Sequence, residues 1–579
     1  MNHKAIDAGA TAYKKFEVPA SWATAEDVKK ESGHTGPAKL VDMVNKILDP
    51  VDRMDGDSLP VSAFEAHVDG TFELGAAAYE KRGVAVSVPA WDATKCIQCN
   101  QCSFVCPHAT IRPYALTEEE AKNAPEAAKI VDIKAGKGKG VYKFAIAVSP
   151  LDCMGCGVCA KICPVGALTM VPQEQEAAQQ DVFNYMVANI TAKEDVADLT
   201  VKGSQFKKPL LEFSGSCAGC AETSYARLIT QLFGDRMYIS NATGCSSIWG
   251  GPAATSPYAT TAEGKGPAWA NSLFEDNAEH GLGMYLGQKA IRERLIAQVK
   301  GMAESDQASE SFKAAFQAFL DTKDDSTANA PAAKALIAEL EKAAAEGCPV
   351  APAVLAEKEY LSKKSVWIFG GDGWAYDIGF GGVDHVLASG EDVNVFVFDT
   401  EVYSNTGGQA SKASNIGQVA QFAAAGKTIA KKSLAEIAMT YGYVYVAQVA
   451  MGYDQAQTLK ALREAESYPG PAIVICYCPC LEQHIKAGMS CTQDEMKKAV
   501  ECGYWHLYRY DPRRIAEGKN PFQLDSPAPD TDKLMDFLMG ENRFASLKNN
   551  FPERADALYQ KEIADVKARY QKYRKMAED

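Results

Sequence analysis

Short apolar runs alternate with amphipathic stretches along the last two thirds of the chain. Two of these runs, residues 365–369 and 393–398, are rich in β-branched and aromatic residues and contain almost no polar position. Continuous apolar runs of this length are typical of strands buried on both faces of a parallel sheet. Residues 206–579 are therefore predicted to form an α/β domain. The Ala-, Glu- and Lys-rich segment 304–346 should add exposed helices to it, and residues 552–579 a charged terminal helix.

The first 205 residues have a different composition and contain an internal repeat. The stretch Cys96–His108 is echoed by Cys153–Val165 at a spacing of 57 residues. Between the two copies, the acidic run Glu118–Glu120 and the Gly/Lys run 136–140 are interpreted as a solvated loop insertion. We expect five segments in order: 1–35, the tail of an upstream domain; 36–90, a small linker domain; 91–172, the repeat; 173–205, a polar linker; and 206–579, the α/β domain.

Composition and charge exclude several classes of protein. The 579 residues are 47% hydrophobic and 23% charged, with a mean hydropathy of −0.20, as in ordinary globular proteins. The formal net charge of −14 disfavours binding to nucleic acids or anionic membranes. The first thirty residues lack a continuous apolar core, and no stretch approaches the ~18 apolar residues of a membrane span. We expect neither export nor membrane insertion.

Cysteine carries the strongest signal. The chain has 17 cysteines, an odd number, and most lie in tight groups, which favours metal or cluster ligation in a reducing compartment, the cytoplasm, over disulfides. Both repeat copies have the spacing Cys-x2-Cys-x2-Cys-x3-Cys-Pro of bacterial ferredoxins, in which the fourth cysteine ligates the other cluster. Zinc sites or disulfides would not explain this pattern twice. The predicted ligand sets of the two [4Fe-4S] clusters are Cys96, Cys99, Cys102 and Cys163, and Cys106, Cys153, Cys156 and Cys159.

A candidate diphosphate and metal site follows the first buried run of the α/β domain. Gly371-Asp372-Gly373 comes directly after residues 366–369, and the next predicted strand leads into the segment Asp399–Asn405. Glycines at a strand–turn–helix junction let backbone N–H groups approach a diphosphate, and Asp372 supplies a hard oxygen for Mg²⁺. A lone Gly-Asp-Gly could also be a plain β-turn.

This region resembles the thiamine-diphosphate fingerprint, in which an aspartate is followed nearly thirty residues later by an oxygen-bearing side chain and a ligating carbonyl. The resemblance implies that Asp372, Thr400 and the carbonyl of Val402 bind Mg²⁺. Thr400 stands where the commonest pattern has Asn.

A third group of cysteines lies in the α/β domain. Cys217 and Cys220 form a Cys-x2-Cys pair, Cys245 stands alone, and Cys476, Cys478 and Cys480 alternate along one short segment. A Cys-x2-Cys pair with two distant cysteines is compatible with either a zinc site of four cysteines or a [4Fe-4S] cluster, and composition does not distinguish them.

Together with the two ferredoxin runs, the segments around these cysteines and around Asp372 resemble the C-terminal half of pyruvate:ferredoxin (flavodoxin) oxidoreductase over essentially the whole chain. The resemblance implies the fold class: a thiamine-diphosphate-binding, doubly wound parallel sheet domain of the α/β class, preceded by a bacterial 2[4Fe-4S] ferredoxin-like α+β domain. It also implies that the third cluster lies close to the thiamine and is held by Cys217, Cys220, Cys245 and Cys480, whereas Cys476 and Cys478 are small side chains nearby.

The same resemblance implies the residues at the cofactor. They are Glu222, Cys245, Gly371, Asp372, Gly373, Trp374, Thr400, Val402 and Asn405, with Glu222 and Asn405 as catalytic candidates and Asn405 near the oxoacid. Glu222 alone could equally be a surface carboxylate. Cys348, Cys491 and Cys502 are expected to be buried non-ligands, and all eight histidines, including His108, His280, His385 and His484, to be structural.

The function implied is the coenzyme-A-dependent, reversible oxidative decarboxylation of pyruvate to acetyl-CoA and CO₂. Electrons would pass through three [4Fe-4S] clusters to ferredoxin or flavodoxin. Residues 1–90 are too short for the second thiamine domain, so we expect a partner subunit carrying the oxoacid and coenzyme A sites, in a heterotetramer. The alternatives are an oxidoreductase for oxalate, 2-oxobutyrate or 2-oxoglutarate, and a non-catalytic electron-transfer subunit.

Overall fold

A central sheet dominates the computed structural model, which describes residues 2–25, 33–134, 136, 139–252 and 254–578. Its eight described strands run in the order β15-β14-β12-β13-β9-β8-β6-β7. The six strands from β12 to β7 are parallel, whereas β14 and β15 are added antiparallel at one edge. The bounds are β6 Met237–Ala242, β7 Ala268–Ser272, β8 Ser365–Gly371, β9 Asn394–Asp399, β12 Tyr445–Val449, β13 Ala472–Tyr477, β14 Tyr508–Tyr510 and β15 Phe522–Leu524.

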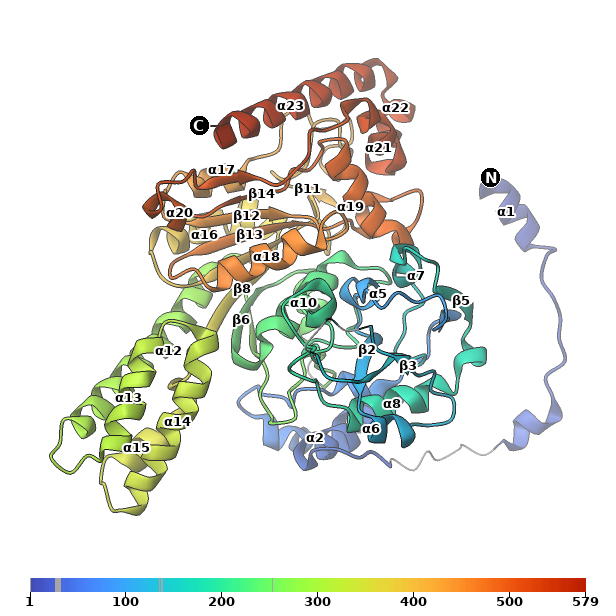
Figure 1. The fold of residues 1–579 in the computed structure, drawn as a ribbon. Coiled ribbons are helices and arrows are strands. Elements are labelled where there is room, and N and C mark those ends of the chain that lie inside the picture. Colours follow the sequence, from blue (N-terminus) through green and yellow to red (C-terminus); the bar gives the residue numbers. More distant parts are fainter. Residues whose placement is uncertain (1, 26–32, 135, 137–138, 253, 579) are drawn as a thin grey trace.

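The two strands predicted from the apolar runs are confirmed as β8 and β9, which are neighbours at the centre of the sheet. Every residue of β9 is buried, as is all of β8 except its last glycine. Helices separate consecutive parallel strands and cover the sheet (Figure 1), so both faces exclude water and the strands read as continuous apolar runs. They include α10 Ala221–Phe233, α11 Cys245–Gly250, α16 Phe380–Ala388, α17 Leu434–Met439 and α18 Gln455–Glu466.

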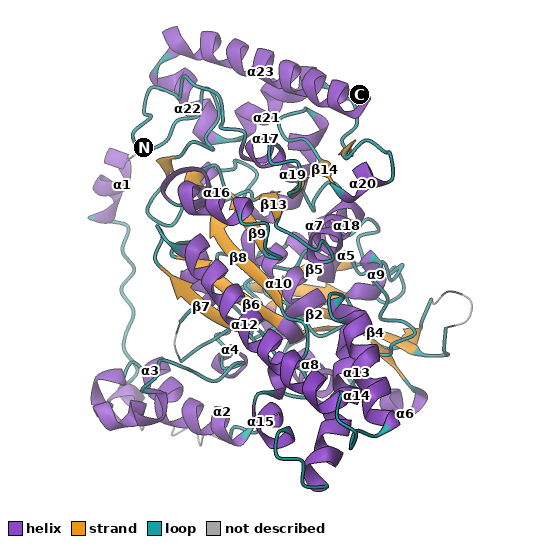
Figure 2. Cartoon of the chain, turned by 90° about the vertical axis from the view of Figure 1, so that its left-hand side faces the viewer, coloured by secondary structure: helices purple, strands orange, loops and turns teal. Residues whose placement is uncertain are grey.

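A helical arm projects from the edge of the sheet near β6 and β8 (Figures 1 and 2). It is built from α12 Asn277–Ala303, α13 Glu310–Thr322, α14 Ser326–Ala345 and α15 Ala351–Ala356. The predicted helices in segment 304–346 are thus present as α13 and α14. They are more than surface additions, because Leu295, Phe316 and Leu336 form a separate apolar core among them.

The cysteine repeat forms a compact unit beside the sheet. Strands β1 Ser87–Trp91 and β5 Leu168–Pro172 pair antiparallel, and each cysteine run contains a short helix, α5 Gln101–Phe104 or α7 Val158–Ile162. These two helices pack against each other, as the repeat predicts. Helix α8 Gln179–Asn189 and the short α9 Val201–Ser204 follow in the polar segment 173–205.

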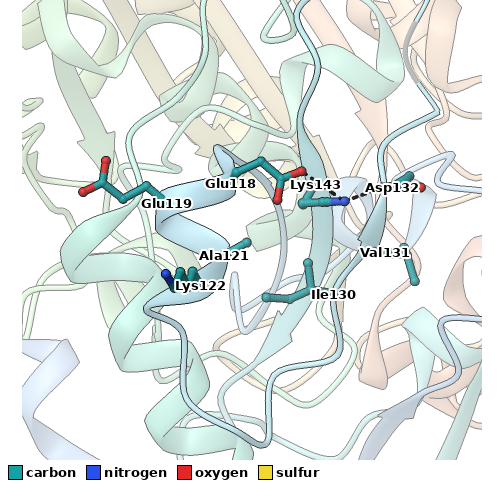
Figure 3. Close-up of a pocket in the computed structure, with 8 residues that line it drawn as sticks. All are labelled: Glu118, Glu119, Ala121, Lys122, Ile130, Val131, Asp132 and Lys143. Atoms are coloured by element: carbon teal, nitrogen blue, oxygen red, sulfur yellow. Dashed lines mark hydrogen bonds and ion pairs between the residues drawn. The ribbon is translucent and has the colours of Figure 1, made fainter.

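The described part of the insertion between the two cysteine runs contains strands and a helix, which corrects the expectation of a loop for its acidic run. Strands β2 Ile111–Leu116, β3 Val131–Asp132 and β4 Lys143–Val148 form a three-stranded sheet. The acidic run opens helix α6 Glu118–Lys122, because Thr117 and Glu120 form a reciprocal capping box. A surface hollow of about 840 Å³ lies between α6 and β3 (Figure 3), where Lys143 pairs with Glu118 and Asp132. Of the Gly/Lys run 136–140, residues 137 and 138 lie outside the described residues.

The two ends of the chain differ in packing. Residues 2–25, with α1 Asn2–Gly9 and η1 Ala20–Thr24, are exposed and lie apart from the rest (Figure 1). Next come α2 Ala38–Met43, η2 Val44–Leu48, α3 Asp49–Asp52, η3 Gly56–Ser58, η4 Val61–His67 and α4 Ala77–Glu80. At the other end are α19 Thr492–Glu501, α20 Arg513–Ala516, α21 Leu534–Gly540, α22 Asn542–Asn550 and the predicted terminal helix, α23 Pro552–Glu578. Across the described residues, no helix combines the length and apolar character needed to cross a bilayer.

Candidate thiamine and iron–sulfur sites

The Gly-Asp-Gly turn and the Asp399–Asn405 segment meet at the carboxyl ends of two adjacent parallel strands. Asp372 follows β8 and Thr400 follows β9, and the register pairs Gly371 with Phe398. The Thr400 hydroxyl donates to Asp372 Oδ1 at 2.9 Å and lies 3.0 Å from the carbonyl oxygen of Val402. The structure therefore brings all three predicted magnesium-binding groups into contact.

The environment of Asp372 suits a divalent cation. Its side chain is fully buried and accepts hydrogen bonds from the Ser411 hydroxyl at 2.6 Å and the Thr400 amide at 3.1 Å. Among the described residues no lysine or arginine forms an ion pair with it. Burial raises the pKa of Asp372 to about 8, and the carboxylate of Asp399 adds to the shift. A buried carboxylate without a bonded cation is a hard-oxygen donor that Mg²⁺ would stabilise in its charged form.

Glycines allow close approach around this turn. A Cβ on Gly373 would lie 2.6 Å from the ring of Tyr403, and one on Gly370 would lie 2.3 Å from the ring of Trp374. The chain continues from Asp372 into the π-helical segment η8 Gly373–Ile378. Trp374 is buried there, and its indole N–H has no hydrogen-bond partner among the described residues. The cofactor-binding candidates Gly373 and Trp374 are thus tightly packed at this turn, whereas a Cβ on Gly371 would come no closer than 3.9 Å to the carbonyl oxygen of Phe398.

A cavity of about 130 Å³ lies next to this turn. It contains all four cysteines named for the third cluster: Cys217 and Cys220 precede α10, Cys245 begins α11, and Cys480 follows β13. Glu222, Thr400 and Asn405 line the same cavity. The metal-binding turn and the third group of cysteines therefore share one cavity, through Thr400.

Cys480 differs in position from Cys476 and Cys478, the two nearby alternatives for the fourth ligand of the third cluster. Cys476 and Cys478 are fully buried, lie 3.5 Å apart at their sulfurs, and do not line the cavity. The Cys476 thiol instead donates to the carbonyl oxygen of Val397 at 3.2 Å. The end of the buried segment explains the difference, because β13 and the two residues after it are buried, whereas the chain leaves the core at Cys480, which is only half-buried.

Glu222 is a buried carboxylate at the first turn of α10. It accepts a hydrogen bond from the indole N–H of Trp249 at 2.9 Å. Burial raises the pKa of Glu222 to about 7, and burial, with this carboxylate nearby, raises the pKa of Cys220 to about 12. The surface-carboxylate alternative for Glu222 is wrong, because only 6% of the residue is exposed. A carboxyl group with a pKa near 7 can hold or release a proton at neutral pH.

The ferredoxin cysteines lie in two groups. A second cavity is lined by Cys96, Cys99, Cys102 and Cys163, the crossed set predicted from the spacing. In the other set, the sulfur of Cys106 lies 3.6 Å from the Thr110 hydroxyl. Burial, with Cys106 nearby, raises the pKa of Cys153 to about 11 and of Cys156 to about 12. Within the described part of the chain, no three His, Cys, Asp or Glu side chains converge closely enough for a single metal ion.

Several residues that hold the metal-binding turn were not identified from the sequence. Glu401 lies between the two ligand positions at a left-handed φ of 64° and is fully buried. Its carboxylate accepts from Lys431, Tyr504 and Arg543 at 3.0, 2.6 and 2.6 Å. Although burial raises it, the pKa of Glu401 is held at about 2 by Lys431 and Arg543. The positive φ leaves no periodic signal in the sequence, and its partners lie up to 142 residues away.

The cysteines and histidines expected to have no role at the site range from buried to exposed. Cys491 and Cys502 are buried, whereas Cys348 is only half-buried, because it lies at the end of the helical arm. His108 is buried against Ser216, with its ring nitrogen 2.9 Å from the hydroxyl. His280 lies 2.7 Å from the Ser240 hydroxyl. His385 and His484 line none of the cavities described above.

Comparison with known proteins matches this arrangement. The family described as a 4Fe-4S dicluster domain covers residues 95–167, the C-terminal TPP binding domain of thiamine pyrophosphate enzymes covers 339–476, and a domain of unknown function covers 29–85. The chain is 51% identical to pyruvate-flavodoxin oxidoreductase of Klebsiella pneumoniae over 100% of its own length and 49% of that protein. It is 52% identical to pyruvate:ferredoxin oxidoreductase of Moorella thermoacetica, with the same coverage. The chain is homologous to these pyruvate oxidoreductases along its whole length.

A third relative carries a different name. Pyruvate dehydrogenase [NADP(+)] of Euglena gracilis is 45% identical over 98% of this chain and 31% of that protein. A solved 2-oxoglutarate:ferredoxin oxidoreductase from Magnetococcus marinus aligns with a TM-score of 0.28 at 15% identity, over 46% of this chain and 65% of that one, a likeness that supports no inference here. The chain spans about half the length, or less, of the curated relatives it matches.

These findings confirm the resemblance and the fold class predicted from the sequence. Thiamine-binding and 4Fe-4S domains are present. The number of clusters, Mg²⁺, coenzyme A and the role of each residue stay predictions.

Proposed function

We propose that the chain is the thiamine- and cluster-bearing part of a pyruvate:ferredoxin or pyruvate:flavodoxin oxidoreductase. The overall reaction converts pyruvate and coenzyme A into acetyl-CoA, CO₂ and one proton, and two electrons pass singly to two one-electron acceptors. One observation carries the proposal: the cavity lined by Cys217, Cys220, Cys245 and Cys480 shares Thr400 with the Asp372 turn. An electron acceptor at the cysteines would thus lie next to a cofactor at the turn.

Each group has a role within this proposal. Bound thiamine diphosphate supplies the electron sink for decarboxylation. Asp372, Thr400 and the carbonyl of Val402 hold Mg²⁺ on its diphosphate. Glu222, with its pKa near 7, holds a proton next to the cysteine cavity, and Asn405 orients the oxoacid. The four cysteines hold a third [4Fe-4S] cluster, and the two ferredoxin sets carry the electrons outward.

The partner chain is part of the proposal. Ile248 and Leu481 line the shared cavity and are 63% and 53% exposed, and Ile378, which follows the Gly-Asp-Gly turn, is 47% exposed. Exposed apolar side chains around a site are typical of an interface. We propose that a second subunit with the oxoacid and coenzyme A sites covers this face, in a heterotetramer. A reducing compartment such as the cytoplasm would keep the cluster-binding cysteines, among the 17 free cysteines of the chain, from forming disulfides.

Pyruvate-dependent reduction of a viologen dye, with thiamine diphosphate, Mg²⁺ and coenzyme A, tests the proposal. The purified chain should be inactive alone and active with the partner chain. Turnover by the chain alone would refute the split active site. A higher specificity constant for 2-oxoglutarate than for pyruvate would make 2-oxoglutarate, and not pyruvate, the proposed substrate. An iron-loaded complex without thiamine would favour a non-catalytic electron-transfer subunit.

A further inference from the structure

The region that matches a domain of unknown function ends at a charged tripeptide, Glu80-Lys81-Arg82. Lys81 adopts a left-handed φ of 45° directly after α4. A non-glycine residue is held in this conformation only where its surroundings fix it. The tripeptide begins at Glu80, the last residue of α4, and precedes β1, which begins the ferredoxin-like unit at Ser87.

On one side the tripeptide binds the segment that leads into Cys153. The ammonium of Lys81 lies 2.6 Å from Asp152 Oδ2, and the side chain of Asp152 is only 2% exposed. The amide of Gly83 donates to the carbonyl of Leu151 at 2.8 Å. Because Asp152 is the residue before Cys153, these contacts fix the start of a cluster-binding loop.

On the other side it binds the segment that leads into Cys217. The guanidinium of Arg82 donates to the carbonyl oxygens of Phe213 and Ser214, each at 3.3 Å, and Glu80 accepts from the same guanidinium. The ammonium of Lys81 lies 5.0 Å from the centre of the Phe213 ring. Lys81 therefore contacts both segments, and Ser214 stands three residues before Cys217.

We propose that Glu80-Lys81-Arg82 is a positioning element that ties the segment before Cys153 to the segment before Cys217 and so fixes the spacing of the two clusters. The inference rests on the cluster assignment of the proposed function. When one electron moves between these clusters, one is oxidised and the other reduced by one electron, with no bond made or broken. The rate of such a step falls steeply with the gap, so a rigid spacing has a direct functional effect.

Hydrogen exchange and paramagnetic resonance of the full chain, purified anaerobically with its iron, test whether the tripeptide links the two segments. We expect Lys81→Met to raise exchange about tenfold in peptides covering both 149–153 and 211–217, because a partly buried ion pair is lost. Iron per chain should stay at the wild-type value, whereas the spin coupling between reduced clusters should change. Lys81→Arg should restore both readouts.

The matched control is Lys95→Met, which removes an exposed ion pair with Asp92 next to Cys96 without touching the Cys217 segment. If Lys81→Met left hydrogen exchange unchanged in either segment, or gave a paramagnetic resonance spectrum identical to that of wild type, the proposed link between the segments would be refuted. Loss of iron with faster exchange throughout the chain would also refute it, because the tripeptide would then serve only folding. A wild-type chain without iron would refute the proposed clusters instead, and the exchange rates would still show whether the two segments are joined.

Discussion

Replacing Arg543 with methionine should destabilise the chain strongly and loosen a metal-binding turn that lies 142 residues away in sequence. Its side chain is 1% exposed and donates to Glu401 at 2.6 Å, to Glu541 at 2.7 Å and to the Tyr477 hydroxyl at 3.2 Å. Methionine fills much of the space but leaves the fully buried carboxylates of Glu401 and Glu541 without the guanidinium of Arg543. Removing one partner of a buried ion pair lowers the free energy of unfolding by about 3–5 kcal/mol. Because Lys431 still pairs with Glu401 in the variant, we expect a loss at the lower end, about 3 kcal/mol.

Urea unfolding of wild type and variant measures this loss. Arg294→Met is the matched control, because Arg294 forms an ion pair with Glu357 that is 53% and 38% exposed; such pairs contribute about 0–1 kcal/mol. Arg543→Met should also raise the Mg²⁺ concentration needed to retain thiamine diphosphate, because Glu401 stands between Thr400 and Val402. Equal stability in the two variants would refute the buried-pair argument, and unchanged Mg²⁺ dependence would refute the link to the turn.

Three further outcomes are expected. The pKa of Asp372 is raised by burial to about 8, so the native apo state holds a proton that the unfolded chain releases, and stability should fall as the pH rises from about 4 to 8. Mg²⁺ should bind more tightly at pH 8 than at pH 6. In thermal melts, Asp372→Asn should weaken the fall in stability, to which Glu222 with its raised pKa also contributes, and should abolish the stabilisation by Mg²⁺. Cys480→Ser should remove the paramagnetic resonance signal of the cluster near the thiamine. Loss of the same signal in Cys478→Ser would instead assign the fourth ligand to Cys478. Cys163→Ala and Cys99→Ala should lose the same cluster, leaving thiamine bound; loss of different clusters would contradict the crossed assignment.

The central strands and the cysteine sets could be predicted because their signals are local. An all-apolar run such as residues 365–369 has few alternatives to a buried strand, and parallel pairing then places the residues after β8 and β9 side by side. The choice of Cys480 came from the resemblance alone, and the structure places Cys480, but not Cys478, on the cavity wall.

Other features depend on contacts that no local pattern records. Arg543 meets Glu401, and Lys81 meets Asp152, only because distant segments fold together. The edge strands β14 and β15 have three residues each, too few for an alternating pattern to stand out. The acidic run Glu118–Glu120 is a different case, because its capping box of Thr117 and Glu120 is a local sequence pattern that the interpretation as a loop overlooked.

The most direct test is the cofactor content of the purified complex of this chain with the proposed partner subunit. Iron, thiamine and magnesium should be measured after gel filtration, for wild type and for Asp372→Asn. The account predicts twelve irons per chain, about four per [4Fe-4S] cluster, with one thiamine diphosphate and one Mg²⁺, and loss of the last two alone in the variant. Equal retention of thiamine and Mg²⁺ in both proteins, or eight irons in a fully active wild-type complex, would contradict a shared site for the cofactor and the third cluster.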